Sequence, residues 1–253
     1  MKADREMKMR FFATVLAGLA VIFPQIVSAQ AAADDWSYSV MPYLWLPTVK
    51  ANLNFNDKSV ETKPDSYLDN LDFAGMLTGA ARKGRWVIGS DLMYMHFSDS
   101  QSKVRAGGLL DTSGDIDIKG LVWTAAGGYS LILEPKANLD VFAGFRYLGL
   151  NTEVNTNIIF ARSAEKDVNI WAGIVGARGR ANLGDSKWFA NGYVDVGSGS
   201  SAFTWQGVAG VGYAFDWGDV ILDYRYLYYS QSGRKLIEDM KMGGPALGVN
   251  FRF

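Results

Sequence analysis

The clearest pattern in the sequence is an alternation of apolar and polar residues with a period of two, as in a β-strand. Between residues 220 and 229 the even positions are apolar or aromatic, whereas the odd positions include Asp223 and Arg225. No stretch after residue 30 has a convincing helical period. Ten strands are predicted, at residues 36–55, 70–82, 85–99, 114–132, 138–155, 166–183, 187–197, 201–217, 219–231 and 243–253.

The two faces of these strands favour a membrane barrel over a soluble β-sandwich, although a sandwich also alternates. Aromatic residues gather near the ends of the apolar faces, as in the girdles of transmembrane barrels at the two membrane interfaces. The predicted interface residues are Trp86, Tyr94, Trp171, Trp188, Trp205, Tyr213 and Phe215. The polar faces combine charged residues with glycine, which suits a narrow lumen.

The connections between the strands give an independent indication. The joins at 83–84, 133–137, 184–186 and 217–218 are short. Of the other five, those at 56–69, 100–113, 156–165 and 231–242 are longer or more polar, and the one around 197–200 is brief but rich in glycine, so short and long joins alternate along most of the chain. This alternation is typical of periplasmic turns and extracellular loops. The sequence therefore predicts an all-β fold, a closed antiparallel transmembrane β-barrel of ten strands. Eight strands are the alternative, if the first segment, broken by Pro47, or the glycine-rich segment 187–197 does not span.

The N-terminal residues have the three parts of a secretory signal peptide. A net positive start is followed by an apolar stretch, 11–23, and Val27-Ser28-Ala29 resembles a cleavage site. The apolar stretch is too short to cross about 30 Å of hydrocarbon. We therefore expect a signal peptide, 1–29, and a barrel domain, 30–253, with cleavage after Ala31 as the alternative.

Composition excludes several classes of function. The formal net charge is −1 and both signs are scattered, which argues against a nucleic-acid binder. There is no cysteine, which excludes disulfides and thiolate metal sites. The sequence has no phosphate-binding glycine loop, metal triad or nucleophile elbow. We expect no metal and no cofactor.

The C-terminal segment is an alternating strand that ends on an aromatic residue. Its last six residues are Gly-Val-Asn-Phe-Arg-Phe, with Phe251 and Phe253 on the apolar face. This ending resembles the assembly signal of bacterial outer-membrane proteins. The resemblance implies that the barrel-insertion machinery and periplasmic chaperones handle the chain. A barrel in the outer membrane would also contact lipid and lipopolysaccharide there.

Longer motifs carry a second resemblance. They are Pro42–Trp45, Arg82–Trp86 with Asp91, Tyr193–Gln206, Gly210–Phe215 and Gly244–Gly248. Together they resemble a family of largely uncharacterised proteobacterial outer-membrane barrels, of the small porin-like or surface type. The resemblance implies the fold and a place in the outer membrane. It implies no activity for any residue.

Eight charged residues are expected to face the lumen. They are Asp91, Arg146, Arg178, Arg180, Asp195, Asp223, Arg225 and Arg252, with Glu153 near the outer end of its strand. They would line a narrow path for ions or small solutes, or they would pair and plug the lumen. Buried charges need partners, and eight to ten strands leave little room. We favour the plug.

The single histidine, His96, is close in sequence to Ser98 and Asp99, a combination that suggests a hydrolase. Ser98 would lie about 6–7 Å along the same face, too far for a nucleophile–base hydrogen bond. With Asp91 inward, parity directs His96 towards lipid headgroups. We therefore expect a non-enzymatic barrel with no catalytic residue and a structural or surface-interaction role. A narrow channel and a barrel hydrolase acting on lipid or peptide are the alternatives.

Overall fold

The computed structural model describes residues 35–53, 58–62, 71–105, 111–156, 162–199, 202–231 and 237–253, and gives only the backbone for several strand ends. The predicted signal peptide lies outside these residues. None of the described residues form a helix that is long and apolar enough to cross a membrane.

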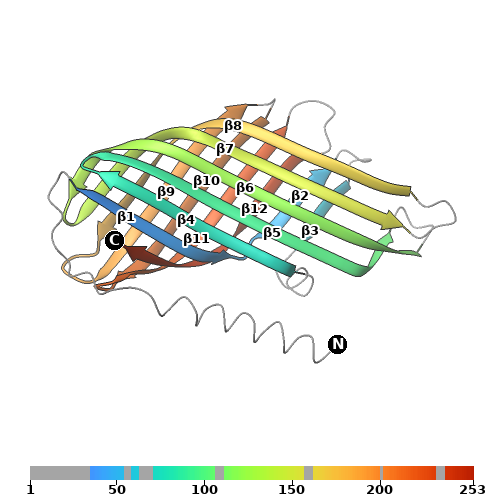
Figure 1. Cartoon of the computed structure of the whole chain (residues 1–253), viewed down its shortest axis with the longest axis horizontal. Helices are drawn as coiled ribbons and strands as arrows, with labels where there is room; N and C mark the ends of the chain where they lie inside the picture. The colour runs from blue at the N-terminus through green and yellow to red at the C-terminus, as the bar shows by residue number, and fades with distance from the viewer. Residues whose placement is uncertain are drawn as a thin grey trace, which may run out of the picture. The chain divides into compact units, whose positions relative to one another are not determined.

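The described residues form antiparallel strands in a single sheet. The strands are β1 (Trp36–Trp45), β2 (Thr48–Leu53), β3 (Lys58–Thr62), β4 (Leu71–Lys83), β5 (Trp86–Arg105), β6 (Asp111–Glu134), β7 (Ala137–Thr156), β8 (Arg162–Asn182), β9 (Trp188–Gly199), β10 (Ala202–Ala214), β11 (Gly218–Gln231) and β12 (Ile237–Arg252). Neighbours in the chain are neighbours in the sheet from β4 to β12, and β12 pairs with β1. The predicted closed ten-stranded barrel is confirmed (Figure 1).

The first predicted strand, 36–55, is divided in the structure. It becomes β1 and β2, which pair with successive parts of β12 and are separated by Leu46 and Pro47. Proline has no backbone N–H to give to a ladder, which explains a break at this position. Leu46 still donates its N–H to the carbonyl of Pro245, 3.0 Å away. The chain then adds β3, an extra strand paired with β2 inside a segment predicted as a loop.

The barrel closes between its first and last strands. Ser39 lies opposite Arg252, and Trp45 lies opposite Ala246. Beyond this ladder, the backbone N–H groups of Tyr38 and Phe253 each donate to the other residue's carbonyl at 2.9 Å. The last residue of the chain is therefore hydrogen-bonded to the start of β1.

The short connections that follow β4, β6, β8 and β10 lie at one end of the barrel, which we call the turn end. The β4–β5 and β8–β9 turns contain Gly84 and Gly184 at φ of 56° and 66°, a conformation that residues with a Cβ rarely adopt. The start of β1 and the end of β12 also lie at this end, because they pair with each other and β1 pairs with the end of β4. The opposite end, which carries the longer connections and the brief one between β9 and β10, is the loop end.

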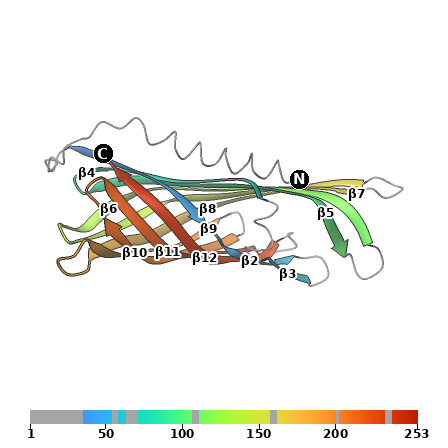
Figure 2. The same ribbon diagram turned by 90° about the horizontal axis from the view of Figure 1, so that it is seen from below.

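Strands β5 to β8 are much longer than their neighbours. They have 20, 24, 20 and 21 residues, whereas β9, β10 and β11 have 12, 13 and 14. The ladder between β5 and β6 continues to the pair Arg105 and Asp111. The ladder between β4 and β5 already ends at the pair Leu71 and Phe97. The four long strands therefore project beyond the loop end as a sheet (Figures 1 and 2).

Candidate functional site

The eight charged residues predicted to face the lumen all lie at inward-facing strand positions. Register brings seven of them into two buried pairs and two neighbouring groups, and one of the seven, Arg252, lies at the rim of the turn end. Asp223 has no ion pair among the described residues, but accepts a hydrogen bond from Asn191 Nδ2 at 2.8 Å. The side chain of Glu153 is not described.

The first buried pair joins β7 to β9. Arg146 Nη1 and Nη2 lie 3.0 and 2.5 Å from the two carboxylate oxygens of Asp195, and neither side chain has exposed surface. Arg146 also donates to the hydroxyls of Thr124 and Thr204 at 3.1 and 3.3 Å. This bidentate geometry is the strong form of an arginine–carboxylate pair. It ties four strands together across the lumen.

The second buried pair joins β11 to β5. Arg225 Nη2 lies 2.5 Å from Asp91 Oδ2, and Nη1 donates to the hydroxyl of Tyr43 at 2.7 Å. Tyr43 in turn donates to Asp91 Oδ1 at 2.7 Å, so the three residues form a closed ring. Gln206 accepts a further bond from Arg225 at 3.0 Å, and Thr78 donates to Asp91 at 3.0 Å. Sequence reasoning did not find Tyr43, because a tyrosine gives no signal of an inward position by itself.

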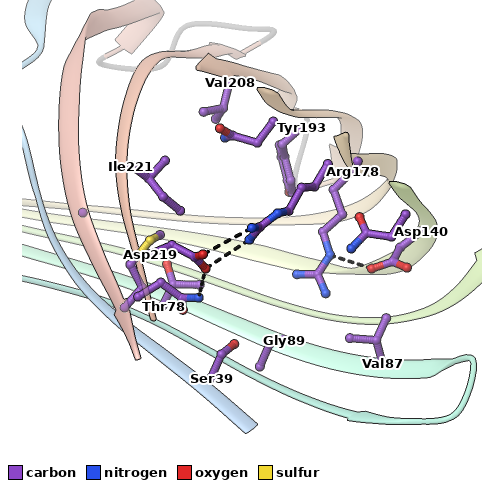
Figure 3. Close-up of a pocket in the computed structure, with 18 of the residues that line it drawn as sticks. Ser39, Thr78, Val87, Gly89, Asp140, Arg178, Tyr193, Val208, Asp219 and Ile221 are labelled. Carbon is purple, nitrogen blue, oxygen red and sulfur yellow. Dashed lines mark hydrogen bonds and ion pairs between the residues drawn. The ribbon is translucent and has the colours of Figure 1, made fainter. Parts of the chain in front are cut away.

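A first arginine–aspartate–arginine group lies closer to the turn end. Asp140 is almost fully buried and accepts from Arg82 Nη2 at 2.7 Å and from Arg178 Nε at 3.0 Å. The hydroxyl of Ser130 donates to the same carboxylate at 2.7 Å and accepts from Arg82. Figure 3 shows Arg178 reaching Asp140 through Nε alone.

A second group of the same composition lies beside it. Arg180 Nη1 and Nη2 donate to the two oxygens of Asp219 at 3.1 and 3.2 Å. Arg252 Nη2 is 3.5 Å from Asp219, and Asn250 donates to it at 3.0 Å. The Arg180 guanidinium also lies 3.5 Å from the centre of the Phe189 ring, which fixes its position.

Three of these charged residues were absent from the predicted set, namely Arg82, Asp140 and Asp219. Two of them had a detectable signal. Asp140 has the same parity as Arg146 in β7, and Asp219 has the same parity as Arg225 in β11. Strand parity extended to the turn end would have placed both in the lumen.

The loop-end half of the lumen is apolar, which differs from the expected inner face of charge and glycine. The buried cluster is rich in methionine and consists of Trp45, Met76, Met93, Val122, Leu148, Ile170, Ala202, Leu227, Tyr229, Met240, Met242 and Ala246. Trp45 Nε1 donates to the carbonyl of Gly244 at 3.2 Å, and its ring lies 5.3 Å from the Arg225 guanidinium carbon. We call this cluster the apolar plug.

A cavity of about 750 Å³ occupies the turn-end half of the lumen. Its lining reaches from Phe253 and Lys136 at the rim to Asp91 and Arg225 below the apolar plug. We call this cavity the vestibule. Its lining includes six cationic side chains, Arg82, Lys136, Arg178, Arg180, Arg225 and Arg252, and five acidic ones, Asp91, Glu134, Asp140, Asp219 and Asp223.

The outer face of the barrel carries two rings of aromatic side chains. At the turn end, Trp86 meets Tyr129 and Trp188 meets Tyr213, with ring centres 5.2 Å apart in both pairs. The predicted interface residues Trp86, Trp188, Tyr213 and Phe215 lie in this ring, and Trp171 and Trp205 lie in the loop-end ring. Tyr94 also faces outwards, by the alternation of β5.

The belt between the two rings is apolar and exposed. Its side chains include Leu77, Ile88, Val175, Val194 and Leu222, each about half exposed. Trp205 and Tyr213 are separated by eight residues, which span about 26 Å along a strand, or about 20 Å along the axis of a barrel whose strands tilt by ~40°. This height is close to that of the apolar band of outer-membrane barrels.

His96 lies on the outward-facing side of β5, because it has the opposite parity to Asp91 and Met93. The side chains of Ser98 and Asp99 are not described. Phe253 has an outward, half-exposed side chain, and Phe251 packs against Trp217 with ring centres 5.6 Å apart. No group of three or more potential metal ligands is found among the described residues.

No family model matches the sequence, and no curated protein matches it. Solved structures do match. The translocator domain of the autotransporter NalP from Neisseria meningitidis is 14% identical, with 100% of this chain and 97% of that chain covered and a TM-score of 0.47. Ail, the attachment invasion locus protein of Yersinia pestis, is 13% identical, with 87% and 99% covered and a TM-score of 0.40.

Neisserial surface protein A is a third similar structure, 13% identical, with 86% of this chain and 97% of that chain covered and a TM-score of 0.33. All three scores are below 0.5 and the identities are low. The fold of this chain is therefore established by its own strand pairing, and nothing about its role follows from these similarities.

Proposed function

We propose that the protein is an integral barrel of the outer membrane with a structural or surface-interaction role and a closed lumen. The observation that carries the location is the exposed apolar belt between two aromatic rings. On a soluble protein, a continuous belt of this kind would cause aggregation. In lipid it is the expected outer surface, and the closed sheet satisfies the backbone hydrogen bonds.

The arrangement inside the barrel supports a closed lumen. Two buried ion pairs, Arg146–Asp195 and Arg225–Asp91, cross the middle, and the apolar plug fills the space above them. An ion would have to break a charge pair and then pass through a dry apolar layer. The sheet of β5 to β8 that projects beyond the loop end supports a role at the cell surface, where it offers its strands to partners.

Fractionation and gel mobility test the location. The protein is expected in the outer-membrane fraction, and an unboiled sample is expected to migrate differently from a boiled one. Recovery in the soluble periplasmic fraction would contradict the proposal. During export and assembly, we expect contact with periplasmic chaperones and the barrel-insertion machinery, and in the membrane with lipid and lipopolysaccharide.

A narrow channel for ions or small solutes is the second candidate, and the vestibule is the observation that favours it. Conductance of the purified barrel in planar bilayers separates the two. Discrete current steps would support the channel, whereas a closed barrel gives none. We also propose that the protein is not an enzyme; a lipid or peptide hydrolase activity lost on His96→Ala would contradict this.

A further inference from the structure

Arginines outnumber aspartates in the two groups that line the vestibule. Arg82 and Arg178 share Asp140, and Arg180 and Arg252 share Asp219. Each group therefore retains one positive charge. Two lining carboxylates, Asp223 and Glu134, have no ion pair among the described residues; Asp223 instead accepts a hydrogen bond from Asn191 in β9. The ion pairs among the residues that line the vestibule therefore do not neutralise the two arginine-containing groups.

The unused hydrogen-bond donors lie on one strand. Arg178 and Arg180 are two residues apart in β8, so their side chains leave the same face about 6–7 Å apart. Arg178 uses only Nε in a hydrogen bond to a described residue, and its terminal nitrogens face the cavity (Figure 3). Arg180 uses one donor of each terminal nitrogen on Asp219 and keeps the others.

The surroundings of these two arginines suit a bound anion. Their side chains are 33% and 26% exposed, so they are partly desolvated but reachable from the open rim of the vestibule. The ion pairs with Asp140 and Asp219 fix the positions of the Arg178 and Arg180 guanidinium groups, respectively. An oxyanion between them would gain charge-assisted hydrogen bonds without new ordering of long side chains.

We infer that Arg178 and Arg180 form a binding site for a small oxyanion, a carboxylate or a phosphate group, which enters the vestibule from the periplasm. The site goes beyond the proposed structural role. Binding at this site does not require the loop end to be closed. A conductance measurement therefore tests the closed lumen, and a binding measurement tests the anion site, each independently of the other.

The test is calorimetric titration of the purified barrel with inorganic phosphate and, separately, with acetate, at constant ionic strength set with chloride. Saturable binding of at least one probe is expected for the wild type. Arg178→Gln should weaken it by about tenfold or more, since a hydrogen bond to a charged group is lost. Lys187→Gln is the matched control, because Lys187 pairs with exposed Asp216 in a turn outside the vestibule.

Heat-dependent gel mobility shows whether each variant has assembled. If Arg178→Gln does not assemble, Arg178→Lys replaces it: this variant keeps the charge but loses the planar fork, and weaker binding than wild type is still expected. Wild-type binding that Arg178→Gln or Arg178→Lys weakens and Lys187→Gln leaves unchanged supports the site. Absence of saturable binding with both probes, or equal affinity in the Arg178 variant, overturns it.

Discussion

Arg146 and Asp195 form a two-point ion pair in the middle of the barrel, with Nη–Oδ distances of 3.0 and 2.5 Å and no solvent-exposed surface on either side chain. The residues are 49 positions apart in the chain. The pairing of β7 with β8 and of β8 with β9 brings them together. The pair is therefore a sensitive reporter of the assembled fold.

Arg146→Met is expected to lower the free energy of unfolding by about 3–5 kcal/mol, because Asp195 is left buried and charged without its partner. Urea unfolding of the barrel in detergent, followed by gel mobility, measures the change. Lys136→Met is the control, since Lys136 and Asp185 form an ion pair that is mostly exposed; its effect should stay within about 1 kcal/mol. Equal effects of the two substitutions would contradict the structural importance of the buried pair.

We expect the apolar plug to close the lumen on the loop-end side of the buried ion pairs. Met76 and Met93 lie opposite each other in β4 and β5 and face inwards, whereas the next pair, Leu77 and Leu92, faces outwards. Met76→Ala with Met93→Ala removes volume from the plug, and we expect discrete current steps in planar bilayers that the wild type lacks. Leu77→Ala with Leu92→Ala is the matched control and should remain silent. Steps in the wild type would disprove the closed lumen.

Much of the fold could be predicted from the sequence, because a closed barrel imposes a period of two on every strand. The strand order, the antiparallel pairing and the closure by Phe253 follow from alternation and from short turns. The division at Pro47 was visible as a break, but β3 was not expected. Its few residues lie in a polar segment without clear alternation, and β12 supplies the edge on which the β2–β3 hairpin forms.

The inside of the barrel was harder to predict. Parity indicated eight charged residues as inward-facing, but the predicted set lacked Arg82, Asp140 and Asp219. The partners of all of them depend on the register of strands far apart in the chain. Met76 and Met93 show the second difficulty. In a membrane barrel an apolar residue suits the lipid face and a packed lumen equally well, so its identity does not fix its side. Only the parity of charged neighbours such as Asp91, extended along the whole strand, would have placed Met93 inside.

The outward belt should tolerate charge only near its edges. Val194 and Ser198 are both exposed on the outer face of β9, Val194 in the belt and Ser198 near the loop end. Val194→Arg is expected to cost about 2–4 kcal/mol in lipid vesicles, and Ser198→Arg about 0–1 kcal/mol, because the penalty depends on depth. Folding titrations in vesicles measure both. A similar small effect at the two positions would argue that β9 does not face hydrocarbon.

Phe253 is expected to matter for delivery more than for stability. Its structural contribution is through the backbone, by two hydrogen bonds to Tyr38, while its side chain is about half exposed. Phe253→Ser should therefore leave the unfolding midpoint of refolded protein nearly unchanged, yet sharply lower the amount assembled in the outer membrane of cells.

Phe215→Ser removes a similarly exposed aromatic from the turn-end ring without altering the C-terminus, and it serves as the control. It should assemble in cells at close to the wild-type level. If Phe253→Ser assembles as well as Phe215→Ser, the C-terminal aromatic does not act as an assembly signal. If instead it refolds poorly in vitro, the side chain stabilises the closed barrel directly, and the loss in cells needs no recognition step.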